Sequence, residues 1–321
     1  VTSKPTTTDS QQTNQINQAK SLKIHSHEEV LVKSTEYFNG DTLAANVWMN
    51  KYALKDSDGN IYELTPDDMH RRIANEVARI EQKYPNPMSA EEVYELIKDF
   101  KYIVPQGSPM AGIGNNMQVS SLSNCFVIGN EGTSDSYGGI MKIDQEQVQL
   151  MKRRGGVGHD LSHIRPTGSP VKNSALTSTG IVPFMERYSN STREVAQDGR
   201  RGALMLTISI KHPDAERFID AKLEAGKVTG ANVSVKIDDE FMQAVETDRD
   251  WPLLFPVTSL GESGQGVSEL VQRHWPGHRG SVACRVLHRL PARRLWQRIM
   301  EANYDTAEPG VLFIDRANEE N

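Results

Sequence analysis

The chain has 321 residues, 37% of them hydrophobic and 24% charged, which is enough for one large α/β domain or two smaller ones. Its formal net charge of −6 argues against a broad nucleic-acid-binding surface, and no apolar run is long enough to span a membrane. Two cysteines cannot build a disulfide framework, so we expect a cytoplasmic protein.

The N-terminal part divides into a tail and a helical region. Residues 1–21 are rich in Thr, Gln, Ser and Asn, and this composition predicts a disordered tail. Residues 22–104 are predicted to be mainly helical. Thr65 and Pro66 are typical of a helix start, and Ser89 with Glu92 forms a capping box for another helix. Because the sequence shows neither an initiator Met nor a stop signal, we expect a fragment of a longer protein.

Residues 105–321 alternate between strand and helix patterns, which predicts a mainly parallel α/β architecture. Strands are predicted at 122–128, 203–210, 232–237 and 309–315, and helices at 135–153, 180–196 and 291–303. The strand at 203–210 is almost continuously apolar, as expected when helices cover both faces of a sheet. Residues 258–281 interrupt this pattern, and we expect them to form an exposed, irregular insertion.

Two clusters combine glycine with arginine, at residues 152–158 and 197–202. Glycines let backbone N–H groups approach a phosphate, and guanidinium groups bind oxyanions through two parallel hydrogen bonds. The clusters therefore suggest nucleotide binding. Each cluster alone is more typical of a tight, solvated turn, because short Gly-rich matches are common.

Cys125 is the most distinctive single residue. A lone cysteine in an apolar strand is usually an inert, buried side chain. Cys125 lies in sequence between the loop that contains Ser108 and the first Gly/Arg cluster, both of which are candidates for phosphate contact. A thiol beside a bound nucleotide would be suited to redox chemistry.

Several ordered motifs together resemble the large, catalytic subunit of ribonucleotide reductases. The resemblance runs from about residue 33 to the C-terminus, outside the insertion, and rests on Gly107-Ser108-Pro109-Met110-Ala111-Gly112, Ser123-Asn124-Cys125-Phe126, Gly155-Gly156-Val157-Gly158, His163-Ile164-Arg165-Pro166-Thr167-Gly168-Ser169-Pro170, Arg200-Arg201-Gly202-Ala203-Leu204-Met205 and Asn232-Val233-Ser234-Val235. His212-Pro213-Asp214 and Ala307-Glu308-Pro309-Gly310-Val311-Leu312-Phe313 are most similar to the adenosylcobalamin-dependent class II type.

The resemblance implies an α/β fold that forms about the first half of a ten-stranded α/β barrel, preceded by the small helical region. It also implies a role for each of three groups of residues. Cys125 would be one of two redox thiols, and Ser108, Asn124 and Gly156 would hold the substrate with it, although Asn124 stands where family members often have Ser. Asp135, Arg165 and Lys172 would bind the effector. The specificity loop would comprise Gln197, Asp198, Gly199, Arg200, Arg201 and Gly202. No metal ligand is implied.

The implied reaction is the reduction of ribonucleotides to 2′-deoxyribonucleotides by thiyl-radical chemistry, with adenosylcobalamin as cofactor and a dNTP or ATP as allosteric effector. A thioredoxin-like reductant and a second copy of the chain are the implied partners. The radical Cys, in an Asn-x-Cys-x-Glu motif, and the second redox Cys have no match here, and Cys284 is read as structural, so this fragment should be inactive alone. Two alternatives stay open: a class I large subunit that uses a separate radical-generating subunit, and a non-catalytic nucleotide-binding module.

Overall fold

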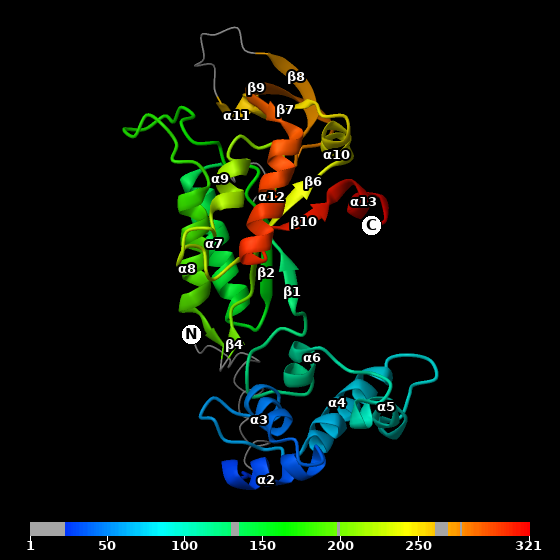
Figure 1. Cartoon of the computed structure of the whole chain (residues 1–321). Helices are drawn as coiled ribbons and strands as arrows, with labels where there is room; N and C mark the ends of the chain where they lie inside the picture. Colours follow the sequence, from blue (N-terminus) through cyan, green and yellow to red (C-terminus); the bar gives the residue numbers. More distant parts are fainter. Residues whose placement is uncertain (1–22, 130–134, 198–199, 261–268, 277) are drawn as a thin grey trace, which may run out of the picture. The chain divides into compact units, whose positions relative to one another are not determined.

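The computed structural model describes residues 23–129, 135–197, 200–260, 269–276 and 278–321 (Figure 1). The predicted disordered tail at 1–21 lies outside the described residues. Contacts divide the chain into two compact units. The first unit contains the residues up to Asn124 with Lys152–Gly155 and Ala196–Arg200, and the second contains Cys125–Met151, Gly156–Val195 and Arg201–Asn321. The expected domain boundary at 104/105 stays a prediction.

The first unit is helical and follows the local capping signals of the sequence. Its elements are α2 (His27–Tyr37), α3 (Thr42–Lys51), α4 (Pro66–Glu81), α5 (Ala90–Ile97), η1 (Lys98–Phe100) and α6 (Gly107–Gly112). The capping box of Ser89 and Glu92 begins α5 as predicted, and Asp68 accepts the N–H of Thr65 at the start of α4. The apolar faces of these helices meet in one core that includes Trp48, Met49 and Ile73.

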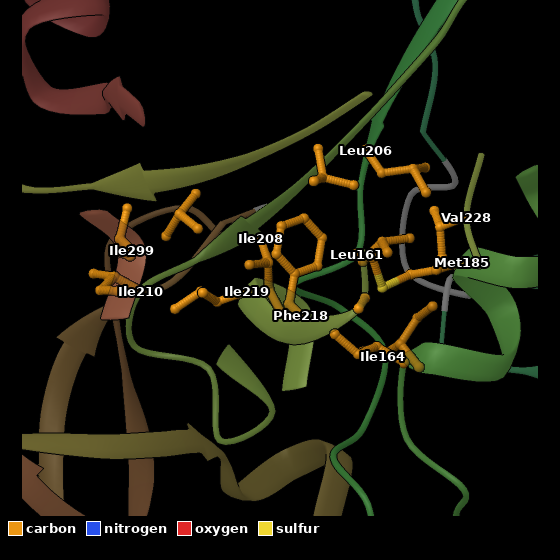
Figure 2. Packing of buried hydrophobic residues seen from close by; sticks show 14 of the residues in the cluster. Leu161, Ile164, Met185, Leu206, Ile208, Ile210, Phe218, Ile219, Val228 and Ile299 are labelled. Atoms are coloured by element: carbon orange, nitrogen blue, oxygen red, sulfur yellow. The ribbon is translucent and has the colours of Figure 1, made fainter. Parts of the chain in front are cut away.

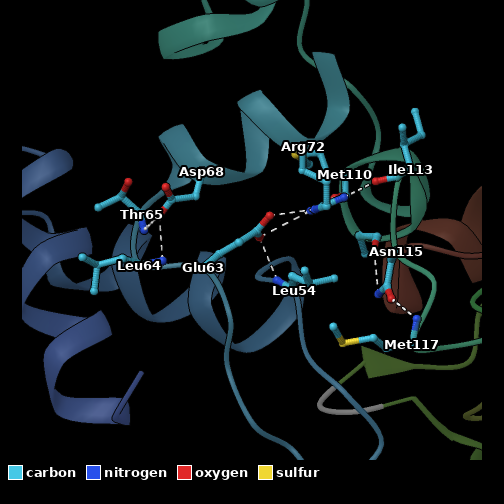
Figure 3. Close-up of polar contacts among 11 residues, drawn as sticks. Leu54, Glu63, Leu64, Thr65, Asp68, Arg72, Met110, Ile113, Asn115 and Met117 are labelled. Atoms are coloured by element: carbon cyan, nitrogen blue, oxygen red, sulfur yellow. Dashed lines mark hydrogen bonds and ion pairs between the residues drawn. The ribbon is translucent and has the colours of Figure 1, made fainter. Parts of the chain in front are cut away.

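Arg72 of α4 forms a buried ion pair with Glu63 and also contacts α6 (Figure 3). Arg72 Nε donates to Glu63 Oε1 at 2.7 Å, while Glu63 Oε2 accepts the N–H of Leu54 at 2.7 Å. The same guanidinium donates to the carbonyls of Met110, at 2.9 Å, and Ile113. Burial raises the pKa of Glu63, and Arg72 opposes that rise. Arg72 therefore fixes three chain segments through one planar group.

The second unit contains a five-stranded parallel sheet (Figure 1). In spatial order its strands are β1 (Cys125–Val127), β2 (Gly156–Asp160), β5 (Leu204–Ser209), β6 (Asn232–Ile237) and β10 (Gly310–Phe313). The helices that follow them in sequence are α7 (Tyr137–Met151), α8 (Val182–Glu194), α9 (Ala215–Asp220), α10 (Asp239–Glu246), α12 (Ala292–Thr306) and α13 (Ile314–Glu319). The predicted fold class, a helical region followed by an α/β domain with a parallel sheet, is thus confirmed.

The core of this unit lies between the central strands and the crossover helices (Figure 2). Leu206 and Ile208 of β5 are fully buried, as are Phe218 of α9 and Met185 of α8. Burial on both faces explains why β5 is almost continuously apolar. None of the helices in the described ranges is long and apolar enough to cross a membrane.

Two predictions from sequence patterns were wrong. The strand predicted at 122–128 to be buried is short, Cys125–Val127, and it is an edge strand with an exposed Val127. The first Gly/Arg cluster was expected to be a loop, yet Gly156 begins β2 and pairs with β1, and Gly158 pairs with both β1 and β5. Glycines lower strand propensity, and pairing on both sides outweighs that deficit here.

A second sheet was missed by the sequence analysis. The antiparallel strands β7 (Asp250–Pro256), β9 (Ser281–Pro291) and β8 (Leu270–His274) form it in that order, with α11 (Val257–Leu260) after β7. The prediction that 258–281 is irregular is therefore wrong for β8, whereas 261–268 and 277 lie outside the described residues. β8 has polar side chains at most positions, and its pairing with the long strand β9 is a tertiary interaction that no local pattern reveals.

We expect Glu63→Leu to destabilise the first unit by about 3–5 kcal/mol, because it leaves the buried Arg72 charge unpaired. Urea unfolding followed by the helical circular dichroism signal would measure this. The control is Glu76→Ala, which removes the exposed pair with Arg79 and should change stability by no more than about 0.5 kcal/mol. Equal effects of the two substitutions would contradict the role of the Glu63–Arg72 pair.

Candidate functional site

Cys125 is the first residue of β1, and its side chain is exposed. Its partner in the parallel register is Gly156, the first residue of β2. The amino ends of two adjacent strands therefore bring these two predicted site residues together. Cys284 differs from Cys125 because it is buried and burial raises its pKa to about 11. A thiolate is the reactive form of cysteine, so Cys284 is poorly suited to redox chemistry at neutral pH.

Ser108 and Asn124, both in the first unit, contact each other at the start of α6. The Asn124 Oδ1 atom accepts the N–H of Ser108 at 2.9 Å, and its Nδ2 donates to Gln106 Oε1. Ser108 is fully buried, and its hydroxyl donates to the carbonyl of Arg154 at 3.3 Å. Asn124 thus has a defined structural role in shaping the Gln106–Ser108 turn, which the sequence alone did not reveal.

One arginine of the first cluster, Arg154, already uses part of its guanidinium group within the first unit. Arg154 has a positive φ of 68°, and its Nη1 donates to the carbonyl of Lys51 at 2.9 Å. Both residues belong to the first unit.

Two of the three predicted effector residues form an ion pair with each other in the second unit. Arg165 donates to Asp135 through Nε at 3.0 Å and through its backbone N–H at 2.8 Å, and Nη2 lies 2.9 Å from Oδ2. Arg165 Nη1 also donates to the carbonyl of Pro170 at 2.7 Å. Burial raises the pKa of Asp135, and the contacts with Arg165 oppose this. Lys172 is exposed on the same connection between β2 and α8.

A buried carboxylate, Asp214, holds the ends of that connection. It accepts the N–H of Thr167 at 3.0 Å and the N–H of Ile181 at 3.3 Å. Its own N–H donates to His212 Nδ1 at 3.0 Å, so His212 Nε2 carries the proton and donates to the carbonyl of Ile164 at 2.8 Å. Burial lowers the pKa of His212, which favours this neutral form. The sequence signal for this arrangement was His212-Pro213-Asp214 directly after a strand.

The predicted specificity loop is described only in part. Ala196–Gln197 and Arg200–Arg201 form the short strands β3 and β4, whereas Asp198 and Gly199 lie outside the described residues. Gly202 packs closely on α8, because a Cβ atom there would lie 2.9 Å from both the Cγ2 and the carbonyl oxygen of Thr192. The loop therefore joins β5 at a position where any larger side chain would displace α8 or the strand.

A charged cluster at the carboxyl ends of β2, β5 and β6 was missed by the sequence analysis. Lys236 Nζ lies 2.6 Å from Asp160 Oδ2, and Lys211 Nζ lies 2.5 Å from Asp238 Oδ2. Burial alone would raise the pKa of Asp160, but Lys236 and Ser162 hold it below the usual value. These side chains adjoin a cavity of about 320 Å³. The signal in the sequence was Lys211 and Asp238, which directly follow the predicted strands at 203–210 and 232–237.

A larger cavity of about 450 Å³ lies beside the Asp214 carboxylate. Its lining residues come from the turn at Thr167–Pro170, from the start of α9, from Leu260 and from β9. In the described ranges we find no group of three His, Cys, Asp or Glu side chains arranged to hold a metal ion.

Comparison with known proteins gives two matching family models. Residues 38–115 match the model described as "Ribonucleotide reductase, all-alpha domain", and residues 123–321 match "Ribonucleotide reductase, barrel domain". The second match covers most of the chain and includes Cys125, Gly156, Asp135, Arg165 and Lys172.

Similar curated proteins include two named "Vitamin B12-dependent ribonucleoside-diphosphate reductase". The protein from Mycobacterium tuberculosis is 29% identical over 283 residues, which is 87% of this chain and 36% of the relative. The protein from Thermoplasma acidophilum is 26% identical over 337 residues, 87% of this chain and 40% of the relative. The "Ribonucleoside-diphosphate reductase large chain" of Neurospora crassa is 29% identical, over 88% of this chain and 29% of the relative. The chain spans well under half the length of these relatives.

We expect Gly180→Ala to disrupt the connection that carries Arg165. Gly180 has a φ of +75°, and a Cβ atom there would lie 2.1 Å from Thr167 Oγ1 and 2.3 Å from Asp214 Oδ2. Gly168→Ala is a matched control, because Gly168 has a φ of +80° and open space around it. The positive φ should cost each variant roughly 1–2 kcal/mol.

The steric overlap should cost Gly180→Ala a further amount of about 1–3 kcal/mol or more. Urea unfolding of both variants measures the difference. Equal loss of unfolding free energy in the two variants would show that the close approach at Gly180 does not contribute to stability.

Proposed function

Since the chain belongs to the family of ribonucleotide reductase large subunits, we propose that the protein of which it forms part reduces ribonucleotides to 2′-deoxyribonucleotides. The observation that carries the proposal is the exposed Cys125 thiol at the amino end of β1, beside Gly156. Cys125 is one of two thiols that reduce C2′ of the ribose and are oxidised to a disulfide. A thiyl radical on another cysteine removes the 3′ hydrogen before water leaves C2′.

We assign substrate binding to Ser108, Asn124 and Gly156 together with Cys125. Asn124 acts as a positioning residue, because its amide holds the N–H of Ser108 and the side chain of Gln106. Gly156 offers backbone without a side chain next to the thiol, so a ribose or phosphate can approach the strand closely.

We assign the radical to adenosylcobalamin, which supplies the initiating radical when it is bound. The support is the name of the relatives from M. tuberculosis and T. acidophilum. The two cavities described above do not fit this cofactor. Their volumes of about 450 and 320 Å³ are those of ordinary small-molecule sites, and charged side chains line both. No residue of this chain is therefore assigned to hold it.

Regulation is assigned to Asp135, Arg165 and Lys172, with residues 197–202 as the specificity loop. A dNTP or ATP phosphate competes with Asp135 for the Arg165 guanidinium, and the exposed Lys172 adds a second cation. Gly202 supports communication, because it packs on Thr192 of α8 and any change in the loop alters that contact. We further propose a homodimer, a thioredoxin-like reductant and a cytoplasmic location. The 321 residues alone do not turn over, because they include neither the radical Cys motif nor a second redox thiol.

The experiment that tests the reaction uses the longer polypeptide that contains this chain, assayed for deoxyribonucleotide formation with adenosylcobalamin and a thioredoxin-type reductant. Cys125→Ala should reduce multiple turnover to background, because no disulfide can form. Cys284→Ala is the matched control and should retain activity, since that thiol is buried. Activity of the Cys125→Ala protein equal to that of the control would refute the assignment. A requirement for a metal-containing partner subunit would instead identify the class I alternative.

For the effector residues, we expect Arg165→Ala to weaken dNTP binding by about 1.5–3 kcal/mol through loss of a charge-assisted contact. Lys172→Ala is a second test, because its exposed side chain can be removed without disturbing the fold. Calorimetry measures the affinity, with Arg79→Ala, in the first unit, as a control that should leave it unchanged. Unchanged affinity in both test variants would remove the regulatory assignment.

A further inference from the structure

The cavity of about 450 Å³ in the second unit is lined in part by side chains that have no role in the sites described above. Two of them are guanidinium groups, Arg217 from α9 and Arg285 from β9, and His288 lies beside them. These residues are far apart in the sequence and come together because α9, β9 and the turn at Thr167–Pro170 all line the same cavity. All of them belong to one compact unit.

Arg285 is the residue that points to a ligand. Its Nε atom is buried, and within the described residues it has no hydrogen-bond partner. A buried donor without an acceptor is energetically unfavourable, and more so when the group is charged. Arg285 also lines the cavity, so an anion bound there would compensate the charge of its guanidinium group. Arg217 is exposed at the same cavity, and no carboxylate of the described residues lies within 4 Å of it.

The lining carries excess positive charge. Asp214 is the one carboxylate among the described lining residues, against two guanidinium groups. Its oxygens already accept the N–H groups of Thr167 and Ile181, so its charge is stabilised within the protein. Planar guanidinium groups match phosphate oxygens through paired hydrogen bonds, so a phosphate is the anion that fits best.

Part of the remaining lining is apolar and suits the other part of such a ligand. The cavity is also lined by four apolar residues, Leu260, Leu287, Pro170 and Pro213. Its volume falls in the range of about 300–1,000 Å³ typical of small-molecule sites, which bind ligands mainly through apolar walls and a few polar groups. A base or sugar can contact the apolar walls while its phosphate contacts the arginines.

We propose that this cavity is a second nucleotide site, in which Arg217 and Arg285 bind the phosphates, separate from the Asp135–Arg165 pair. The proposal does not rest on the reductase assignment, because it uses only the charges, burial and volume of the cavity. Two nucleotide sites on one unit would let one ligand affect the other through the shared connection at residues 165–180.

The test is a calorimetric titration of the 321-residue chain with ATP. Arg217→Ala and Arg285→Ala should each weaken one class of ATP sites roughly ten- to a hundredfold. Arg293→Ala is the matched control, since this exposed arginine of α12 lies outside the cavity and should leave affinity unchanged. Adenosine without phosphates should bind at least tenfold more weakly than ATP. Thermal unfolding of each variant checks that it folds. If Arg285→Ala does not fold, Arg217→Ala still tests the proposal, because Arg217 is exposed.

The outcomes separate this proposal from the effector assignment. Loss of ATP affinity in Arg217→Ala but not in Lys172→Ala supports the cavity and argues against the predicted effector residues. The reverse result overturns the cavity as a nucleotide site. Absence of any ATP binding, or equal affinity of Arg217→Ala and Arg293→Ala, also overturns it.

Discussion

The hydrogen bonds of the buried Asp214 carboxylate organise the functional part of the second unit. Through Thr167 and Ile181 this one side chain fixes both ends of the connection between β2 and α8. His212 fixes Asp214 in turn, and Gly180 leaves the space that the carboxylate occupies. A buried carboxylate is stable only when donors surround it, so the position of Asp214 and the position of this connection depend on each other. Lys172 and one wall of the larger cavity lie on the segment held in this way, and Arg165 lies two residues before it.

Local signals in the sequence predicted much of the fold. The box of Ser89 and Glu92 marks the start of a helix because the two residues satisfy each other's backbone N–H groups, and no distant contact is needed. Residues 232–237 were predicted as a strand with the observed bounds, because their β-branched residues fit a strand buried between helices. Elements that depend on distant partners were not predicted. The strands β7, β8 and β9 stabilise one another, and Gly158 of β2 pairs on both sides despite the low strand propensity of glycine.

The same distinction holds for the candidate sites. Cys125 could be selected from its motif, since the resemblance to a known family depends on sequence alone, and its exposure at the edge of the sheet agrees with a reactive role. The contact of Asn124 with the Ser108 N–H could not be predicted, because residues of this type often bond within their own turn. Arg217 and Arg285 show no common pattern in the sequence. They become a pair only when β9 packs beside the turn after β2.

Charge compensation argues that Arg285 is unusual in this molecule. The buried or half-buried cations Arg72, Lys211 and Lys236 each contact a carboxylate within the protein. Among the described residues, the other buried polar atoms without a partner belong to neutral rings, apart from one oxygen of Asp144, whose second oxygen accepts from Arg187. Arg285 instead has a buried Nε atom without an acceptor among the described residues, and it lines a cavity. A fold that neutralises its other buried cations internally leaves this one to be neutralised by something that enters from outside.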